Sequence, residues 1–541
     1  MGTRVRFGPP KQDKVLGALP VVAEFCRRLD IAGIVDRAVP VRGIALLSHG
    51  EVIEALIANR LTSPAPLVHV EDWAAEWAVE EMFDLDAASL NDDRIGRALD
   101  AVAPALDGIV GSVGVKAIAE FGIDVARLHW DMTSISLFGD YDDPEKGFVE
   151  PRHGHPKDRR PDLKQVQTGL AVSGDGGIPV FHRAYHGGAG EVAQVVPALE
   201  ALVAMAAERK FLLVGDSKLV SYTNLAAMMK AGVSFIAPAS KSYVGADVLA
   251  GCDKSKAVPV AYVAERDQLK AADDRGSYRV AEDTMVLAGP RKSDPTLALR
   301  RVFVWSSARA GAAKTAREKK LDRARGDLTS MAGGLGGRHY PDQAAVAERV
   351  AAIASSRRVK PYLITAVATD ATGKPTLTWS FDQTALDTEA KTDGWYALLT
   401  NLDPGEVDAA EVLNRYKGQE VAERRHGNFK GPLAVAPMFL KNNRRIEALI
   451  SVICLALLIF CLVERAIRLA ISPAVKLAGL WAGRDAKPTG RLIFGALSRL
   501  RLIPATTTSG PIIPEPPPLP ARILALLNVD ATRSRYQTHQ Q

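Results

Sequence analysis

The segment between residues 127 and 238 constrains the fold more than any other part of the chain, because its order of strand-type and helix-type runs allows few topologies. A tight hairpin turn at Asp175-Gly-Gly177 separates two of the strand-type runs. The predicted elements are strands at 127–138, 166–173 and 178–185, a helix at 192–209, a strand at 211–216, a helix at 224–231 and a strand at 234–238. This order predicts an α/β fold that begins with a three-stranded meander.

A meander followed by alternating helices and strands is the order of an RNase-H-like (ribonuclease H-like) sheet, which we expect for the core of this chain. The flanking segments differ from the core. Apolar residues recur at helical spacing before residue 115, and Ser48 and Glu51 have the spacing of a capping box. The predicted parts are an N-terminal helical domain at 1–115, the first part of the core at 116–244, a mostly-β insertion at 245–395 around a charged helix at 308–327, the second part of the core at 396–480 with a helix at 409–430, and a basic, proline-rich tail at 481–541.

One apolar segment has the composition of a membrane span. Residues 448–463 are apolar apart from Ser451, but these 16 residues are fewer than the roughly 20 that cross a bilayer. We therefore expect a buried core helix and no membrane. The start of the chain, Met1 to Phe7, has no apolar run of signal-peptide type, and the four cysteines show no zinc-type spacing. These observations predict a cytoplasmic protein.

Positive charge is concentrated in the last third of the chain. The net charge of the chain is only +6, but residues 424–502 contain fourteen Lys or Arg and three Asp or Glu, which gives 14 − 3 = +11. A second basic run, residues 309–325, has seven basic and two acidic side chains. Such runs suit a phosphate backbone, and a solvated basic surface is the alternative for both.

Two aspartates lie on core strands of the predicted sheet. Asp131 lies within the first strand, and Asp216 ends a short apolar strand. Carboxylates on neighbouring strands repel one another unless a cation lies between them, and Mg²⁺ prefers oxygen ligands. Glu423 is the candidate for a third carboxylate. Tyr416, Glu423 and Lys430 are seven residues apart, so on one helix they share a face within about 20° per step.

Three carboxylates and a nearby cation suit phosphoryl transfer. Two Mg²⁺ ions about 3.5–4 Å apart activate an attacking oxygen and stabilise the leaving oxygen. The sequence therefore predicts that Asp131, Asp216 and Glu423 bind two Mg²⁺ ions, for which Mn²⁺ substitutes, with Tyr416 and Lys430 in supporting roles.

The same residues resemble a known family. Tyr416-x2-Gln419-x3-Glu423-x6-Lys430 resembles the Y-x2-R-x3-E-x6-K signature of insertion-sequence DDE transposases, with Gln419 in place of the arginine. The blocks around Asp131 and Asp216 are similar to the family's two aspartate strands, and residues 157–165 are similar to its K-D-H-R-P-D-L-K-Q block. The resemblance covers about residues 15 to 470, including an N-terminal helical domain and a β-rich insertion.

This resemblance implies a DNA transposase of the cut-and-paste type. Such an endonuclease cleaves double-stranded DNA at the terminal inverted repeats of a transposable element and joins the ends to target DNA, a form of DNA recombination. The resemblance also implies a homodimer in the active complex and DNA binding by the helical domain. We assign DNA contacts to nine basic residues, with loop shaping as the alternative for residues 157–164: Lys157, Arg159, Arg160, Lys164, Arg424, Arg425, Lys441, Arg444 and Arg445.

Three other functions compete with this one. A structure-specific nuclease with an RNase-H-like core would cut without joining. A DNA-binding repressor derived from a transposase would bind without cutting. A membrane protein anchored by residues 448–463 would require detergent.

Overall fold

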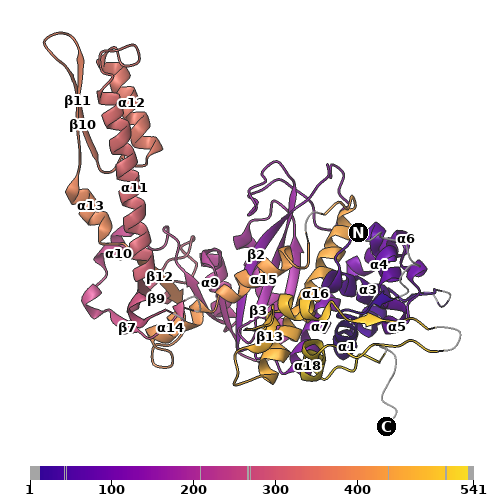
Figure 1. Ribbon diagram of the computed structural model, residues 1–541. Coiled ribbons are helices and arrows are strands. Elements are labelled where there is room, and N and C mark those ends of the chain that lie inside the picture. The colour runs from indigo at the N-terminus through magenta and orange to yellow at the C-terminus, as the bar shows by residue number, and fades with distance from the viewer. Residues whose placement is uncertain are drawn as a thin grey trace. The chain divides into compact units, whose positions relative to one another are not determined.

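The structure is a computed structural model that describes residues 13–533 except 42, 44, 208, 265–266, 269, 436–437 and 506–508. The prediction that the chain has no signal peptide rests on Met1 to Phe7, and these residues lie outside the described ones. The described chain is mixed α/β and forms two compact units (Figure 1). Unit 1 comprises residues 1–218, 230–233 and 418–541, and unit 2 comprises residues 219–229 and 234–417. The boundaries predicted at 115, 244, 395 and 480 do not coincide with this division.

The sheet of unit 1 confirms the predicted meander. Its strands lie in the order β4-β3-β2-β5, with β2 antiparallel to β3 and parallel to β5, and β3 antiparallel to β4. The strands are β2 (Arg127–Ser136), β3 (Gln165–Ser173), β4 (Pro179–Tyr185) and β5 (Leu212–Gly215). All nine residues of β3 are buried, because the strand is paired on both sides and covered on both faces.

The turn between β3 and β4 uses the two glycines that the sequence predicts. Gly176 and Gly177 have φ of +78° and +64°, a region that costs a residue with a Cβ about 1–2 kcal/mol. A Cβ on Gly177 would also lie 2.2 Å from Cγ1 of Val421. Gly177 therefore serves both the turn and the close approach of another helix.

We expect Gly177→Ala to lower the free energy of unfolding by about 1–3 kcal/mol more than Gly122→Ala does, because the alanine overlaps Val421. Gly122 is the matched control, since its φ is +55° and nothing lies within 4 Å of a Cβ there. Chemical unfolding followed by circular dichroism measures both values. Equal losses for the two variants would show that the packing against Val421 adds no cost.

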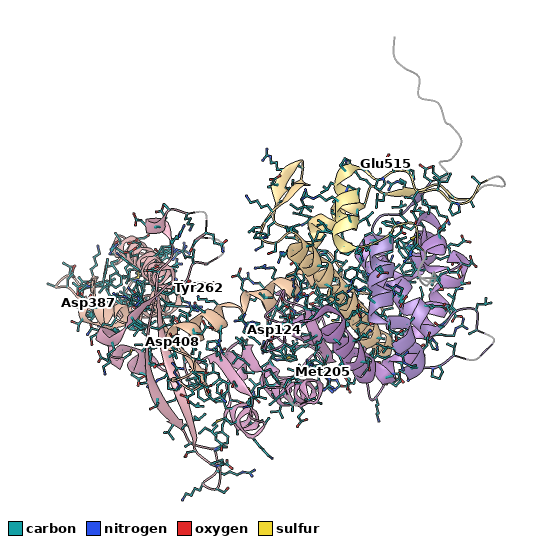
Figure 2. The ribbon with its side chains drawn as sticks, turned by 90° about the horizontal axis from the view of Figure 1, so that it is seen from below. Asp124, Met205, Tyr262, Asp387, Asp408 and Glu515 are labelled. Atoms are coloured by element: carbon teal, nitrogen blue, oxygen red, sulfur yellow. The ribbon has the colours of Figure 1, made fainter. Side chains whose placement is uncertain are left out.

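The helices before β2 form one core with a long helix near the C-terminal end of the chain. The α-helices before β2 are α1 (Leu19–Leu29), α2 (Ile31–Ala38), α3 (His49–Thr62), α4 (Val70–Glu76), α5 (Val79–Phe83), α6 (Asp92–Val102) and α7 (Leu106–Phe121). The predicted capping box is present at α3, where the Ser48 hydroxyl accepts from the Glu51 amide at 3.1 Å. Figure 2 shows helix α16 (Asn443–Ala470) beside these helices, and α16 packs on α3, α6 and β4.

Helix α16 is longer than the apolar segment from which it was predicted. It has 28 residues, because its charged ends are helical too, and it is therefore long enough to cross a membrane. However, 94% of its most apolar window is buried within the protein. A second helical stretch, Asp92–Phe121, passes the same length and composition test with 39% of its window buried. The 94% burial of the apolar window of α16 is typical of a core helix, as the sequence predicts for residues 448–463.

The remaining elements of unit 1 surround this core. They are β1 (Lys14–Val15), α8 (Val195–Ala206), α15 (Glu420–Lys430), β13 (Leu477–Trp481), β14 (Arg484–Ala486), α17 (Gly490–Leu497), β15 (Arg501–Leu502) and α18 (Pro518–Leu527). Strand β1 pairs with β15, and α17 and α18 pack on α16. The tail predicted at 481–541 is therefore folded onto unit 1 over its described residues.

Unit 2 contains an antiparallel sheet and a helical arm. The sheet has the order β6-β12-β9-β8-β7, from β6 (Ser234–Pro238), β7 (Val258–Val260), β8 (Tyr278–Leu287), β9 (Leu297–Ser306) and β12 (Trp395–Thr400). The arm consists of α11 (Ser307–Ala332), α12 (Gln343–Ser356) and the hairpin β10 (Leu363–Thr369) to β11 (Pro375–Phe381). The other α-helices are α9 (Tyr222–Lys230), α10 (Ala246–Gly251), α13 (Gln383–Ala390) and α14 (Ala409–Lys417).

The insertion at 245–395 is mixed, so the mostly-β prediction is wrong. The insertion contains the strands β7 to β11, but α11 alone has 26 residues and α12 has 14. The alanine-rich sequence of α12 has high helix propensity, and Val346, Val350 and Ile353 form its buried stripe.

The prediction of a single helix at 409–430 is also wrong. It is interrupted at Gly418 and Gln419, so α14 ends at Lys417 and α15 begins at Glu420. Glycine disfavours a helix interior by about 1 kcal/mol, and the Gln419 side chain is bonded to strand β2 instead of continuing the helix face. Tyr416 consequently lies on a different helix from Glu423 and Lys430, and the shared-face argument holds only for the latter two.

Candidate active site

Two aspartates occupy neighbouring positions on parallel strands. Trp130 of β2 lies opposite Gly215 of β5, so Asp131 and Asp216 are the next pair in register. Side chains one residue further along both strands point to the same face of the sheet. The structure therefore brings together the two carboxylates that the sequence predicts as catalytic.

Both carboxyl groups have raised pKa values. Burial raises the pKa of Asp131, and Lys157 and the Met132 amide, 2.8 Å from Oδ1, oppose this shift. Burial also raises the pKa of Asp216, and the neighbouring charge of Asp131 raises it further. A half-buried carboxylate pair is expected to show this behaviour when no cation lies between its members.

Lys157 supplies the nearest positive charge. Its Nζ lies 3.7 Å from Oδ1 of Asp131 and 3.7 Å from Oε1 of Glu191, and it donates a hydrogen bond to the Met132 carbonyl. Sequence reasoning did not find Glu191, because nothing in its local sequence distinguishes it from a surface charge. The Lys157 ammonium group therefore lies between the carboxylates of Asp131 and Glu191.

Helix α15 lies against β2 through side chains on one face. His129 donates through Nδ1 to Oε1 of Gln419 at 3.1 Å, and Nε2 of Gln419 donates to the Trp130 carbonyl at 3.1 Å. Seven residues along the helix from Gln419, Nε2 of His426 lies 3.5 Å from Oδ2 of Asp131. Gln419, the departure from the family signature, thus holds α15 to the strand that carries Asp131.

His426 is a site residue that sequence reasoning missed. Burial lowers the pKa of its imidazole to about 3, and Lys157 also disfavours the charged form. Neither ring nitrogen has a hydrogen-bond partner among the described residues, which is unusual for a buried polar group. Its position three residues after Glu423, on the same helix face, is a signal that could have identified it.

Glu423 and Lys430 occupy different environments on α15. The Glu423 side chain is exposed, and within the described ranges no three His, Cys, Asp or Glu side chains are grouped as they would be around a metal ion. Lys430 is half-buried, and burial lowers the pKa of its ammonium group while Asp158 opposes the shift. Tyr416 is half-buried on α14, in unit 2. The structure thus brings together two of the three predicted carboxylates.

The nine predicted DNA contacts fall into two groups. Arg425 is 2% exposed and paired with Glu464 at 3.0 Å, so its assignment to DNA binding is wrong. Half-buried Arg444 and Arg445 are ion-paired with Glu145 and Asp100. Lys164 is 21% exposed and is likewise paired, with Asp142 at 2.8 Å. The side chains with larger exposure or weaker pairing are Lys157, Arg159, Arg160, Arg424 and Lys441.

We expect Asp216→Asn to raise the free energy of unfolding by about 0.5–2 kcal/mol at pH 8 in EDTA, because it removes a half-buried charge beside Asp131. Because the pKa of Asp216 is raised in the folded state, protonation of its carboxyl group stabilises the folded wild-type protein at pH values below 3.8, the pKa in the unfolded chain. This stabilisation is lost as the pH rises through the pKa of the folded state. The gain should therefore shrink as the pH falls towards 4.

Thermal unfolding at pH 8 and at pH 4 measures this difference. Asp370→Asn is the control. Asp370 and Asp216 each accept a hydrogen bond at 2.8 Å from the backbone amide two residues later in the chain. The pKa of Asp370, however, is lowered by its hydrogen bond with the Thr372 side chain. Its replacement should give no gain at pH 8. A loss of stability in Asp216→Asn at pH 8 would contradict the proposed repulsion.

Comparison with known proteins matches the N-terminal part of the chain to a protein family. Residues 11–106 match the family described as a domain of unknown function, DUF4277. No curated protein matches the chain. Among solved structures, the chain is similar to a piggyBac transposase in a synaptic complex with hairpin DNA, at 8% sequence identity, over 88% of this chain and 79% of that chain, with a TM-score of 0.38. That TM-score is too low to establish a common fold.

Proposed function

We propose that the protein is a DNA transposase that cleaves the ends of an insertion sequence and transfers them into target DNA. The observation that carries the proposal is the pair of half-buried carboxylates of Asp131 and Asp216, which lie side by side on β2 and directly after the end of β5. Paired carboxylates of this kind hold the metal ions of phosphoryl-transfer enzymes. The resemblance of the segment from Tyr416 to Lys430 to the transposase signature supports the same reaction.

The strand order supports an RNase-H-like core. In unit 1 the meander β2-β3-β4 comes first, and β5 then lies parallel to β2 on the opposite side from β3. This places the first and fourth strands of the core side by side, with one aspartate on each. The DDE assignment requires this arrangement of its first two acids.

The residues at this site fit a divalent cation. Asp131 and Asp216 offer oxygen ligands whose repulsion a cation would relieve, and Glu423 is the proposed third carboxylate. The unpartnered imidazole nitrogens of His426 beside Asp131 mark a place where a polar partner is missing. When bound, two Mg²⁺ ions, or Mn²⁺ in their place, supply Lewis acidity to the phosphodiester and to the attacking oxygen.

The other residues would bind and orient the DNA strand. Lys157, 3.7 Å from Asp131, would hold a phosphate oxygen next to the carboxylates. Lys430 would hold a second phosphate, since its half-buried ammonium group gains from an anionic partner. Contacts to the duplex are proposed for Arg159, Arg160, Lys164, Arg424 and Lys441. A homodimer in the cytoplasm would pair the two ends of the element.

The test is an assay of the purified protein with a labelled duplex that carries the end of its own element, in Mg²⁺, Mn²⁺ or EDTA. Metal-dependent cleavage together with joined products supports the transposase. Cleavage without joining would identify a structure-specific nuclease. Tight binding to the end without cleavage would identify a repressor, and the absence of any interaction with DNA would contradict all three functions.

A further inference from the structure

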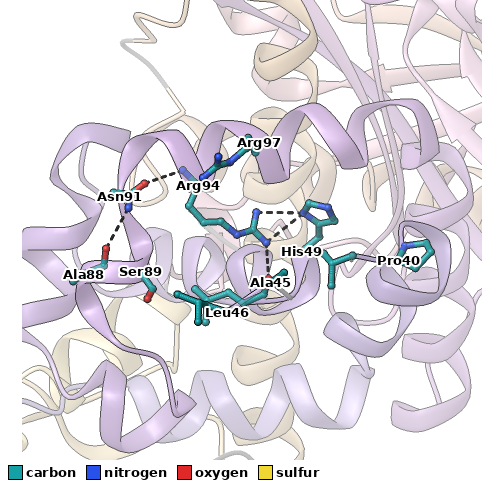
Figure 3. Close-up of a pocket in the computed structure, with 11 residues that line it drawn as sticks. Pro40, Ala45, Leu46, His49, Ala88, Ser89, Asn91, Arg94 and Arg97 are labelled. Carbon is teal, nitrogen blue, oxygen red and sulfur yellow. Dashed lines mark hydrogen bonds between the residues drawn. The ribbon is translucent and has the colours of Figure 1, made fainter. Parts of the chain in front are cut away.

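An open pocket of about 750 Å³ lies among the N-terminal helices of unit 1 (Figure 3). Its size is in the range of ligand pockets in proteins. His49, the first residue of α3, and Arg94 and Arg97 of α6 line one part of it. Leu46, which is 89% exposed, lines another part. The pocket therefore combines basic side chains with an apolar rim.

Hydrogen bonds fix the orientation of the two central side chains. Nη2 of Arg94 donates to the Leu47 carbonyl at 2.9 Å, and both Nη atoms of Arg94 lie 3.4–3.5 Å from Nδ1 of His49 (Figure 3). A guanidinium group only donates, so Nδ1 of His49 is an acceptor and the ring proton is on Nε2. The imidazole therefore presents a donor, in addition to the remaining N–H groups of Arg94.

The positive charge of the pocket is incompletely balanced. Within the part of the chain that the structure describes, Arg94 forms no ion pair. The carboxylates of Asp36 and Glu51 act on Arg94 from a distance. Asp36 accepts a hydrogen bond from the Gly50 amide and Glu51 accepts one from the Ser48 amide, each at 2.7 Å. Burial and Arg97 both lower the pKa of Arg94, and burial and Arg94 both lower the pKa of His49.

Arg97 adds a second cation at the edge of the pocket. Its partner is Asp93, at 2.9 Å, but the two side chains are 63% and 72% exposed. Exposed ion pairs of this kind contribute little to stability, so Arg97 can exchange Asp93 for a stronger anionic partner at small cost.

We propose that this pocket binds a phosphate group of a DNA backbone, with the adjoining sugar or base against Leu46. Two guanidinium groups and an imidazole N–H suit an anion with several oxygens, because arginine pairs with phosphate through two parallel hydrogen bonds. The apolar rim favours a phosphate attached to a nucleoside over a free hydrated ion. The inference rests on the proposed function, and it assigns one DNA contact of the transposase to residues that carry no catalytic group.

The test measures the affinity of the full chain for a fluorescein-labelled duplex of 20 base pairs in EDTA, as a function of salt concentration. Arg97→Gln is expected to weaken binding about 3- to 10-fold and to lower the salt slope by about one, since it removes one phosphate contact. Ala88→Glu places a negative charge on the exposed wall of the same pocket and should weaken binding at least as much. Arg27→Gln is the matched control, because Arg27 is an exposed arginine paired with Glu24 on α1, and it should change affinity less than 2-fold.

A second titration with inorganic phosphate distinguishes the source of the phosphate group. Binding of inorganic phosphate that is lost in Arg97→Gln, with unchanged DNA affinity, would overturn the assignment to DNA. Wild-type DNA affinity in both pocket variants would overturn the inference while leaving the cleavage assay, and the proposed function, intact. Failure of the wild-type protein to bind any duplex would contradict both.

Discussion

Glu464→Ala is expected to lower the free energy of unfolding by about 3–5 kcal/mol, the usual cost of leaving a buried charge without its partner. Glu464 and Arg425 are each 2% exposed. Oε1 of Glu464 lies 3.0 Å from Arg425 and 3.0 Å from Arg468, and Oε2 accepts the Gly490 amide at 2.8 Å. Arg425 also donates to the carbonyls of Gly176 and Gly177. The loss of one carboxylate therefore affects α15, α16, α17 and the β3–β4 turn together.

Two comparisons test the cause of this loss. Glu120→Ala breaks a half-exposed pair with Arg28 at the same distance, 3.0 Å, and should cost about 1 kcal/mol or less. The double variant Arg425→Met, Glu464→Leu should lose less than Glu464→Ala, because no buried charge remains. A double variant less stable than Glu464→Ala would contradict this interpretation.

The dependence of this effect on pH follows from the pKa of Glu464. Burial opposes ionisation, but Arg425 and Arg468 outweigh it and hold the pKa of Glu464 below its ordinary value of 4.5. A depressed folded-state pKa contributes stability that is present above 4.5 and is lost as the pH falls through the folded value. The difference between the wild-type protein and Glu464→Ala should therefore be full at pH 7 and decrease below pH 4.5.

Asp216→Ala is expected to reduce metal-dependent cleavage by about 10³-fold or more. A metal ion contributes several kcal/mol of transition-state stabilisation, and about 4 kcal/mol corresponds to a factor of about 10³ in rate. Asp131→Ala should have an effect of the same size, since the two carboxylates occupy one site. Both variants should also lose the rise in melting temperature that Mn²⁺ gives the wild-type protein. Cleavage above a tenth of the wild-type rate in either variant would contradict the assignment.

Glu423 can be tested against a neighbour on its own helix. Glu420 and Glu423 are both exposed acids in the first turn of α15, and Glu420 is paired with Arg424 at 3.8 Å. If Glu423 is the third metal ligand, Glu423→Ala loses cleavage as Asp216→Ala does and Glu420→Ala keeps it. Equal activities of the two glutamate variants would remove Glu423 from the proposed triad.

The parts of the structure that sequence reasoning predicted correctly depend on local preferences. The alternation of residues 127–138 predicts β2, the Asp-Gly-Gly turn predicts the β3–β4 hairpin, and Ser48 and Glu51 predict the start of α3. Each of these features is determined within a few residues of the chain. Asp131 and Asp216 were proposed as catalytic because carboxylates on neighbouring strands repel one another unless a cation lies between them and because their segments resemble the aspartate strands of the transposase family, and their catalytic role stays a prediction.

The features that were missed depend on residues far apart in the sequence. The break before α15 is accompanied by bonds from Gln419 to His129 and Trp130, about 290 residues earlier. The sequence around Arg425 is typical of a charged residue on the surface of a helix. Its burial depends on Glu464, 39 residues later. His426 and Glu191 join the site only through tertiary packing around Asp131 and Lys157. Apart from the three-residue spacing between Glu423 and His426, none of these contacts has a periodic or local signal.

The discontinuity of unit 1 has a consequence for synthesis on the ribosome. Strand β5 ends at Gly215, but α16, on which α3, α6 and β4 pack, begins only at Asn443. At about 5–20 residues per second, translation reaches α16 about 10–45 s after the sheet of unit 1 has been made. During that interval the nascent chain exposes the apolar surfaces that α16 will cover. A message cut short before α16 would therefore yield a product for proteases and chaperones rather than a folded protein, so the proposed nuclease activity would depend on complete translation of this part of the chain.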